Sequence, residues 1–303
     1  MANILKDKVI IVTGAGGGVG EHIAKEAARQ GGRVIVNDIG KDEAGNFTAE
    51  SITQAIIEAG GQALASTANI ADWASAESLI RQAVDNWGRL DAIINNAGIL
   101  RDKIFHKMSE AEWDQSLLVN LKACFNTSRL AAPIFKEQMG GALVHMTSTS
   151  GLIGNFGQAN YSASKMGLVG LSKSIALDMQ RYNVRSNCIA PFAMTPMIMA
   201  GLPRKTEDDE KRWRIFERMQ PDRIAPLACA LISDAGKDIS GQIFSVRGNE
   251  IFLFSQPRPI RSAHIGTQEG ITTQAVIERV FPMFKPSMYP LERSIDIFAW
   301  DPV

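Results

Sequence analysis

Two residues four positions apart, Tyr161 and Lys165, have the chemical character of a proton-transfer pair. On a helix, positions i and i+4 lie on one face, so the ammonium group can stand beside the phenol. A tyrosine has a pKa of about 10, and a nearby positive charge favours its ionised form. We therefore expect Lys165 to lower the pKa of Tyr161 and make the phenol a general base. Many surface helices carry this spacing without function, so its meaning depends on the rest of the chain.

A glycine-rich turn, Thr13-Gly-Ala-Gly-Gly-Gly-Val-Gly20, follows the first predicted strand and opens a helix. Its spacing is T-G-x-x-x-G-x-G, not the strict G-x-G-x-x-G, and no Lys-Ser or Lys-Thr follows, which excludes a P-loop. Glycines let the backbone approach a pyrophosphate bound at the positive N-terminus of a helix. The alternative is a glycine turn without a ligand. The predicted dinucleotide contacts in this turn are Gly14, Gly16, Gly17, Gly18, Val19 and Gly20.

The second predicted strand ends at Asp38. A carboxylate at this point accepts hydrogen bonds from the ribose hydroxyls of NAD and repels the additional phosphate of NADP. No arginine stands in the glycine turn to bind that phosphate, although Arg33 and Lys41 are cations nearby. A capping role is the alternative for Asp38. The sequence favours NAD as the cofactor.

Further polar residues lie where predicted strands end. The fourth strand ends in Asn95-Asn96-Ala97-Gly98, and the fifth ends in Thr147-Ser148. Parallel sheets of this kind bind ligands at the carboxyl ends of their strands. Asn120 lies inside a long predicted helix, where asparagine is a mediocre helix former, so a specific reason for it is expected.

The elements that must position these residues are short β-branched runs that alternate with amphipathic stretches of helix length. This alternation predicts a parallel sheet with helices on both faces, and right-handed crossovers make it a doubly wound α/β sheet of about seven strands. Without repeats or linkers, residues 1–250 are expected to form one dinucleotide-binding and catalytic domain. The predicted strands are 9–12, 33–37, 63–66, 92–95, 142–147, 184–190 and 242–246, and the predicted helices are 18–30, 49–59, 73–87, 110–138, 158–181 and 223–234.

Two segments do not fit the alternation. Residues 192–222 change from apolar to highly charged, and we expect them to form a lid over the substrate. Residues 251–303 hold seven of the 21 aromatic residues of the chain. A disordered tail would be poor in aromatic residues. We therefore expect this C-terminal extension to pack on its own subunit or on a neighbouring one.

The composition excludes several classes of partner. The chain of 303 residues has 32 Lys+Arg and 32 Asp+Glu, so no net field attracts nucleic acid or an anionic membrane. The three cysteines, Cys124, Cys188 and Cys229, are widely spaced and read as buried thiols, not as a disulfide framework or a metal site. No signal peptide or membrane-spanning run is apparent, so we expect a soluble, cytoplasmic protein.

Taken together, the motifs resemble the short-chain dehydrogenase/reductase family over roughly residues 5–250. The resemblance rests on the glycine turn, residues 95–98, Asn120, Ser148 and Tyr161-x-x-x-Lys165. It implies that Tyr161 exchanges a proton with the substrate oxygen and that Ser148 hydrogen-bonds this oxygen. It also implies that Lys165 binds the nicotinamide ribose, and that Asn120 holds a water molecule that relays protons from Lys165. The expected activity is hydride transfer between a secondary alcohol or ketone and NAD.

The resemblance implies further cofactor contacts and an assembly. Asn69 and Ile70 match positions that touch adenine, and Pro191 and Thr195 match the segment under the nicotinamide. Phe192 replaces the usual glycine after the proline, which restricts the backbone at that position. The family also implies a homotetramer built by pairing the helices at 110–138 and 158–181. The remaining cofactor contacts implied are Asn96, Ala97 and Gly98, together with Tyr161 and Lys165.

Within the family, residues 37–40, 96–102 and 154–162 are most similar to the (3R)-hydroxyacyl-CoA dehydrogenase domain of multifunctional enzyme type 2. This implies a hydrophobic small-molecule substrate that could be linked to CoA. A steroid or another bulky cyclic alcohol is the alternative substrate, because Phe192, Met194, Met197 and Met199 also suit a rigid ring system. From another class, a dinucleotide-binding sensor without turnover would typically lack the tyrosine or the lysine. The cations that could meet CoA phosphates are Lys205, Lys211, Arg212 and Arg214.

Overall fold

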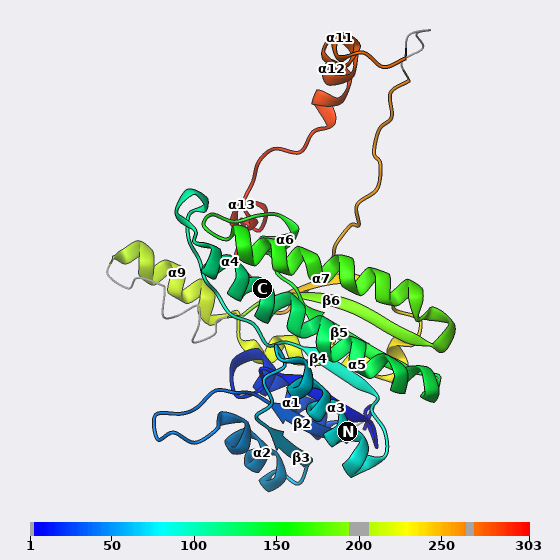
Figure 1. Cartoon of the computed structure of the whole chain (residues 1–303). Coiled ribbons are helices and arrows are strands. Elements are labelled where there is room, and N and C mark those ends of the chain that lie inside the picture. Colours follow the sequence, from blue (N-terminus) through cyan, green and yellow to red (C-terminus); the bar gives the residue numbers. More distant parts are fainter. Residues whose placement is uncertain (1–2, 194–205, 265–269) are drawn as a thin grey trace.

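The computed structural model describes residues 3–193, 206–264 and 270–303, without the side chains at 208, 211, 212 and 216. Eight strands form one sheet in the order β3-β2-β1-β4-β5-β6-β7-β8, flanked by helices (Figure 1). All neighbouring pairs from β3 to β7 are parallel, and only β7 and β8 are antiparallel. The strands are β1 (Val9–Thr13), β2 (Arg33–Asn37), β3 (Gln62–Ser66), β4 (Ala92–Asn95), β5 (Gly141–Met146), β6 (Val184–Phe192), β7 (Ile243–Arg247) and β8 (Glu250–Leu253).

The two faces of the sheet are covered by separate groups of helices, which confirms the predicted doubly wound α/β fold. Successive residues of a strand point to opposite faces. In β1, Ile10 and Val12 pack in a core with α1 and α10, whereas Val9 and Ile11 pack in a second core with α3 and α5. The main helices are α1 (Gly18–Arg29), α2 (Thr48–Glu58), α3 (Trp73–Trp87), α4 (Glu110–Leu117), α5 (Ala123–Gln138), α6 (Thr149–Leu152), α7 (Ala159–Asp178), α9 (Glu207–Glu217) and α10 (Ala225–Ile232).

The strand order reverses between β1 and β4, which are neighbours although β2 and β3 intervene in the sequence. At such a switch point the loops after adjacent strands diverge and leave a crevice at the carboxyl ends. The glycine turn follows β1, and residues 96–98 follow β4. The topology therefore brings both predicted cofactor segments to one position at the edge of the sheet.

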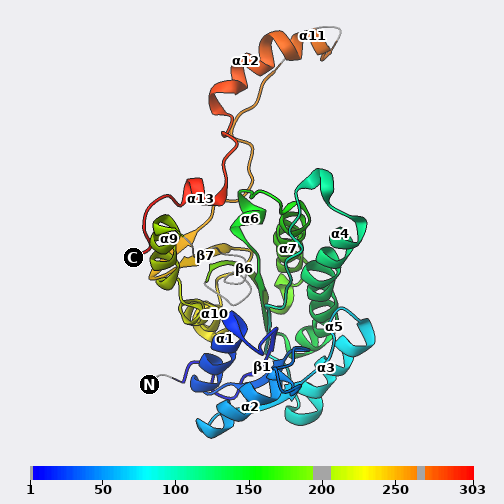
Figure 2. The same cartoon turned by 90° about the vertical axis from the view of Figure 1, so that its left-hand side faces the viewer.

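The C-terminal extension begins inside the sheet and then leaves it. The sequence predicts a boundary near residue 250 and about seven strands, but residues 250–253 form β8, an eighth strand paired with β7. Gln256 still contacts the body, because it accepts a hydrogen bond from Lys173 and donates one to the oxygen of Gly241. Residues 259–264 and 270–291, which we call the arm, stand away from the body and carry α11 (Thr273–Ala275) and α12 (Phe281–Phe284) (Figures 1 and 2). The chain then returns through α13 (Ser294–Ile297). Exposed apolar side chains of the arm include Ile260, Ile271, Ile277, Phe281, Met283, Met288, Tyr289 and Leu291.

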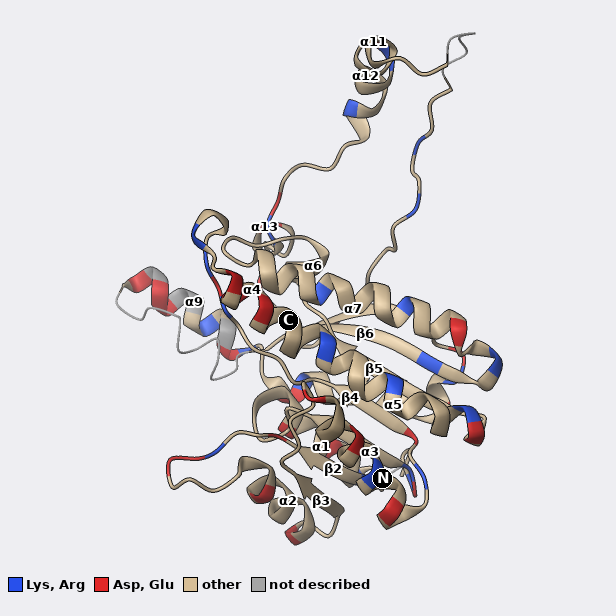
Figure 3. Ribbon diagram, in the orientation of Figure 1, with Lys and Arg blue, Asp and Glu red and all other residues tan. Residues whose placement is uncertain are grey.

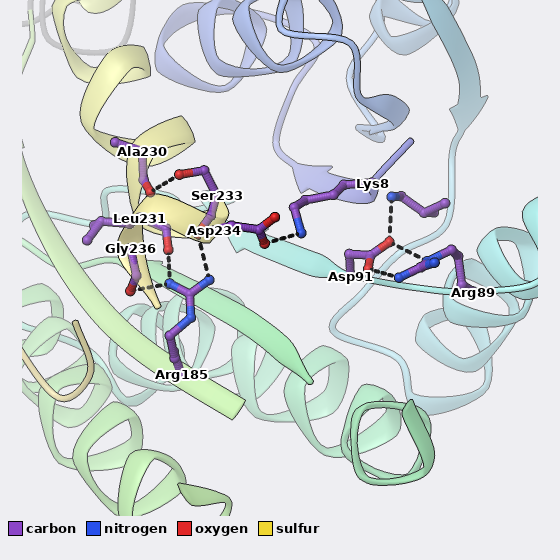
Figure 4. Close-up of polar contacts among 10 residues, drawn as sticks. Lys8, Arg89, Asp91, Arg185, Ala230, Leu231, Ser233, Asp234 and Gly236 are labelled. Atoms are coloured by element: carbon purple, nitrogen blue, oxygen red, sulfur yellow. Dashed lines mark hydrogen bonds and ion pairs between the residues drawn. The ribbon is translucent and has the colours of Figure 1, made fainter. Parts of the chain in front are cut away.

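Charged side chains form pairs at the amino ends of the strands, away from the carboxyl ends where the predicted site lies (Figure 4). Arg185 at the start of β6 donates hydrogen bonds to three backbone carbonyls at the end of α10 and in the turn that follows. Lys8 pairs with Asp234 at 2.7 Å, and Arg89 pairs with Asp91 at 2.6 Å. These residues line a cavity of about 240 Å³. Because each of these five charged side chains already has a partner, we infer that they stabilise the amino ends of the strands.

Positive and negative side chains are interspersed over the body (Figure 3), as the balanced composition predicts. Among the described residues, no helix combines the length and apolar character required to cross a bilayer. Cys124, Cys188 and Cys229 are free, buried thiols, as predicted.

Candidate active site

The turn between β1 and α1 packs so closely on its neighbours at Gly14 and Gly20 that only glycine fits at these two positions. Gly14 and Gly18 have φ angles of +63° and +55°. A Cβ atom at Gly14 would lie 2.6 Å from the Cα of Ala97, and one at Gly20 would lie 2.2 Å from the carbonyl oxygen of Gly14. Both distances are far below any real contact of a Cβ atom. These glycines therefore allow close approach of the backbone segments.

Asn96 and Thr13 hold this turn in place. The Nδ2 of Asn96 donates hydrogen bonds to the backbone oxygens of Thr13 and Gly14 at 3.0 and 2.9 Å. The Oγ1 of Thr13 accepts from the backbone N–H groups of Asn96 and Ala97. The amide of Asn96, predicted as a cofactor contact, thus braces the loop. Thr13 was missed by the sequence reasoning, although it precedes the glycine turn directly.

The turn has room and donors for a diphosphate. A Cβ atom at Gly17 would meet no atom within 4 Å. Helix α1 begins at Gly18, so the N–H groups of Gly18, Val19 and Gly20 lie in its first turn and lack carbonyl partners within the helix. Such donors at the positive end of a helix bind phosphate groups. The residues present therefore fit the pyrophosphate of a dinucleotide.

Asp38 follows β2, and its carboxylate faces the glycine turn. Oδ2 accepts a hydrogen bond from the N–H of Gly16 at 2.9 Å, and Oδ1 accepts one from the N–H of Gly40 at 2.8 Å. The two nearby cations are engaged elsewhere. Lys41 lies 4.5 Å above the ring of Phe47, and Arg33 pairs with Asp7 at 3.1 Å. The position of Asp38 suits the binding of a ribose diol. The negative charge of its carboxylate disfavours a phosphate group at the same place.

The remaining predicted cofactor contacts differ in their exposure and packing. Asn69 is exposed at the surface, whereas Ile70 is 6% exposed and packs in the core beneath α3. Pro191 lies in β6, paired with Val246 of β7. A Cβ atom at Gly98 would lie 2.8 Å from the Oδ1 of Asn120, so Gly98 provides close packing. Thr195 lies outside the described residues, as do Met194, Met197, Met199 and Lys205.

Ser148, Tyr161 and Lys165 come together at the carboxyl end of β5. Ser148 caps α6, and its side chain hydrogen-bonds that of Tyr161 near the start of α7. The Nζ of Lys165 lies 5.5 Å from the centre of the Tyr161 ring. The helical spacing of four residues therefore stacks the cation against the phenol. A hydroxyl, a phenol and an ammonium group are thus grouped at the edge of the sheet where the glycine turn also lies.

The prediction that the pKa of Tyr161 is lowered was wrong. Burial raises the pKa of Tyr161 to about 12, because desolvation disfavours the phenolate. The hydrogen bond from Ser148 opposes this rise, and the negative charge of Asp102 adds to it. At neutral pH, Tyr161 is therefore a proton donor.

Lys165 is held in a buried position by the end of β5. It is 4% exposed, and its Nζ donates a hydrogen bond to the backbone oxygen of Met146 at 2.7 Å. The Oγ1 of Thr147 donates to the backbone oxygen of Lys165 at 2.6 Å. Burial lowers the pKa of Lys165, since desolvation disfavours the ammonium form. Thr147, which the sequence indicates only as the end of a strand, therefore positions α7.

Asn120 lies in a π-helical turn, Leu118–Lys122, that separates α4 from α5, where the sequence predicts one helix over 110–138. Its buried amide is paired in both directions with the backbone of Ile99, at 2.8 and 3.0 Å. Its backbone oxygen accepts from the thiol of Cys124. π-Turns within helices often occur at functional sites. The presence of a poor helix former at this position thus has a structural reason, because Asn120 holds the segment after β4 against this turn.

Two loops that are distant in sequence meet beside Tyr161. Gln158 donates to the Oδ2 of Asp102 at 2.7 Å, and the N–H of Lys103 donates to the oxygen of Gly157 at 2.7 Å. Asn160 donates to the oxygen of Arg101 at 2.9 Å. Residues 96–102 and 154–162, which carry the resemblance to one branch of the family, therefore pack on each other. This contact was not predicted, although the two strings were singled out.

Phe192, the residue in place of the usual glycine, ends β6 with its ring 4.8 Å from that of Phe298, edge to face. A residue near the C-terminus therefore occupies the edge of the sheet next to β5. Of the predicted CoA-binding cations, only Arg214 has a described side chain, and it is exposed on α9.

Comparisons with known proteins agree with this geometry. The family model of the short chain dehydrogenases matches residues 8–206. The peroxisomal multifunctional enzyme type 2 of Mus musculus is 37% identical over 273 residues, which are 89% of this chain but 35% of that protein. This chain therefore spans about a third of that relative.

Two solved structures share the fold. A short chain dehydrogenase from Mycobacterium avium has a TM-score of 0.83 at 34% identity, covering 96% of this chain and 98% of the other. A 7α-hydroxysteroid dehydrogenase, solved with NADH and 7-oxoglycochenodeoxycholic acid, has a TM-score of 0.73 at 30% identity, covering 82% of this chain and 96% of the other.

Proposed function

The chain belongs to the short-chain dehydrogenase family, and we propose that it transfers hydride between NAD and the secondary alcohol or ketone of a (3R)-hydroxyacyl thioester. Membership makes it an oxidoreductase that acts on hydroxyl or keto groups. The cofactor form, the substrate and the roles of individual residues are the proposal. The observation that carries it is the hydrogen-bonded pair Ser148 and Tyr161 with the ammonium of Lys165 against the phenol ring.

The proposed proton transfer follows from this pair. The nicotinamide, when bound, takes or gives the hydride. In reduction, the neutral phenol of Tyr161 donates its proton to the oxygen of the substrate as negative charge develops there. The hydroxyl of Ser148 donates its hydrogen bond to the same oxygen, in place of the bond that it donates to the phenol when no substrate is bound. In oxidation the phenolate takes the alcohol proton, and the cation of Lys165 stabilises that phenolate.

NAD is favoured over NADP by the charges around the glycine turn. The carboxylate of Asp38, which accepts a hydrogen bond from Gly16 in the glycine turn, would meet the adenosine ribose and would repel an added phosphate. Lys41 and Arg33, the cations that could offset this repulsion, are engaged with Phe47 and Asp7. The solved hydroxysteroid dehydrogenase, which contains NADH, supports the same form of the cofactor.

The acyl-thioester substrate is supported by the likeness to peroxisomal multifunctional enzyme type 2 and by the contact between residues 96–102 and 154–162 beside Tyr161. A steroid or bulky cyclic alcohol is the second candidate, favoured by the likeness to the 7α-hydroxysteroid dehydrogenase. A sensor without turnover is disfavoured because both Tyr161 and Lys165 are present and in contact.

We further propose a homotetramer in which the α5 and α7 helices pair. Large apolar side chains are exposed on both, including Phe125 at 42%, Met166 at 40% and Leu177 at 67%. Exposed apolar side chains that gather into a patch are typical of an interface. Light scattering of the purified protein tests the assembly, and a monomer would contradict it. We expect the cytoplasm as the compartment, which fractionation of cells would test.

A substrate panel tests the proposed function. (3R)- and (3S)-hydroxyacyl-CoA thioesters, the free hydroxy acids and hydroxysteroids are each offered with NAD and NADP, and reduced nicotinamide is followed by absorbance. We expect the (3R)-thioesters with NAD to have the highest kcat/KM. Faster turnover of the hydroxysteroids would select the alternative substrate, and equal rates for the thioesters and free acids would remove CoA from the proposal.

A further inference from the structure

The last residues of the chain are fastened to the loop between Ser148 and Tyr161. Figures 1 and 2 both show α13 beside α6. Ser294 is 8% exposed, and its hydroxyl lies 2.7 Å from that of Thr149, where it donates a hydrogen bond. Its N–H donates to the oxygen of Gly154 at 3.1 Å. The segment therefore contacts the residue after Ser148 and the turn that leads to Tyr161.

The same segment is fastened to β6, β7 and β8 on its other side. The ring of Phe298 packs edge to face against Phe192 at 4.8 Å and Phe252 at 5.2 Å. Arg247, which is 1% exposed, donates to the backbone oxygens of Phe298 and Trp300 at 3.1 and 2.8 Å. The indole N–H of Trp300 donates to Glu250 at 2.8 Å. Residues 293–303, which we call the C-terminal clasp, thus bridge the ends of β5 and β6.

The strand order decides which side of the site the clasp occupies. The glycine turn follows β1, whereas Ser148 follows β5 and Phe192 ends β6. With the order β1-β4-β5-β6, the clasp lies on the far side of Ser148 and Tyr161 from the glycine turn. A dinucleotide at the glycine turn therefore approaches Tyr161 from one side and leaves the clasp side for the substrate.

We infer that the C-terminal clasp forms the wall of the substrate site opposite the cofactor, with Phe298 as the residue that determines specificity and Ser294 as a positioning residue for the catalytic loop. The inference rests on the proposed function for its site, but not on the thioester as substrate. The half-buried ring of Phe298, packed on Phe192 and Phe252, would contact the part of the substrate distal to the reacting carbon through its remaining accessible face. Ser294 would act by fixing Thr149 and Gly154.

The kinetic test compares Phe298→Ala with Ile57→Ala, a control on α2, outside the clasp, whose side chain is 47% exposed. Each variant is assayed on a series of 3-hydroxyacyl-CoA thioesters of increasing chain length, and NADH affinity is measured by fluorescence. We expect Phe298→Ala to change the ratio of kcat/KM between the longest and shortest substrates at least tenfold, through KM. NADH affinity should stay within twofold, and Ile57→Ala should match the wild type. An equal loss on every substrate would overturn the specificity role.

A second measurement needs no substrate. Ser294→Ala should accelerate amide hydrogen exchange at Leu152, Ile153 and Gly154, and Ile295→Ala should not. Unchanged exchange in this loop would overturn the positioning role. If the wild type oxidises only another class of alcohol, the proposed thioester substrate fails, and the ratio test is made on a size series of that class. The two failures are therefore distinguishable.

Discussion

Gln158 donates a hydrogen bond to the Oδ2 of Asp102 at 2.7 Å and thereby fixes a carboxylate beside Tyr161. Desolvation raises the pKa of Asp102, and the negative charge of Asp102 in turn raises the pKa of Tyr161. Neither Gln158 nor Asp102 is among the catalytic residues expected from the sequence. The charge of Asp102 therefore offers a way to adjust the acidity of the phenol without touching it.

Replacing Asp102 tests this coupling. Asp102→Asn keeps an acceptor for Gln158 but removes the charge, so the pKa of Tyr161 should fall and the pH profile of alcohol oxidation should move to lower pH. The displacement should be smaller than one pH unit, because the carboxylate is partly exposed and screened by solvent. Asp114→Asn, on the exposed surface of α4, is the matched control. A profile that does not move would exclude the electrostatic role.

The pH dependence of the wild type follows from the pKa of about 12 at Tyr161. Oxidation requires the phenolate, so its kcat/KM should rise about tenfold per pH unit between pH 7 and 9 if no other group limits it. Reduction uses the neutral phenol and should be nearly flat over this range. Initial rates in both directions, measured at constant ionic strength, check this. A flat oxidative profile would mean that the complex has a much lower pKa.

Tyr161→Phe separates catalysis from binding. The substitution removes the hydroxyl group that carries the transferred proton and leaves the ring in place, so kcat should fall by about a hundredfold to ten-thousandfold, the usual range for a general acid or base. NADH affinity, measured by fluorescence titration, should change less than threefold, a factor equal to about 0.65 kcal/mol. Tyr182→Phe, remote in sequence on a short 3-10 turn, is the control. Turnover that survives in Tyr161→Phe would assign the proton transfer to another residue.

Cofactor choice should depend on Asp38. Asp38→Ser removes the charge that repels the phosphate of NADP, so the ratio of kcat/KM for NAD over NADP should fall at least tenfold, or about 1.4 kcal/mol. Part of the loss with NAD will reflect the glycine turn, because Asp38 also accepts from Gly16 and Gly40. Thermal melts with and without NAD separate the two effects. An unchanged ratio would remove Asp38 as the discriminator.

Acid stability should depend on His145, which is buried in β5 with its Nδ1 3.3 Å from the amide nitrogen of Asn95. Burial lowers its pKa to about 4, whereas an unfolded histidine has a pKa of about 6.5. The unfolded chain therefore binds the proton more tightly, and the free energy of unfolding should fall as the pH drops from about 6.5 to 4. The full effect is on the order of 3 kcal/mol.

The histidine variant checks the assignment. Denaturant titrations between pH 4 and 7 should show a weaker dependence on pH in His145→Gln than in the wild type. His106→Gln, at an exposed position, should keep the wild-type dependence. If the two variants behave alike, other groups account for the acid sensitivity.

The sequence predicts the seven parallel strands to within two residues because most of them are short apolar runs that are buried on both faces, as in β1, β2 and β4. The eighth strand was missed, although Gly248-Asn249 is a two-residue hairpin signal between two short runs. Helical periodicity also could not reveal the π-turn at Asn120, since one added residue leaves the apolar spacing almost intact.

The candidate site was harder to predict where it depends on the burial of side chains and on contacts between residues that are distant in sequence. The spacing of Tyr161 and Lys165 indicates their proximity, but it contains no information about burial, which decides the pKa of the phenol. Likewise, the bonds from Asn96 to the glycine turn and from Ser294 to Thr149 join residues whose approach is set by the sheet order. No local pattern in the sequence announces them.

The edge-to-face contact of Phe192 and Phe298 has a consequence for protein engineering. The C-terminal residues cannot be exchanged between relatives as an independent module, because a chimera that takes its tail from one parent and β6 from another would pair mismatched rings. A parent with glycine at position 192 would leave an empty space under Phe298. Successful crossovers should therefore inherit both positions together.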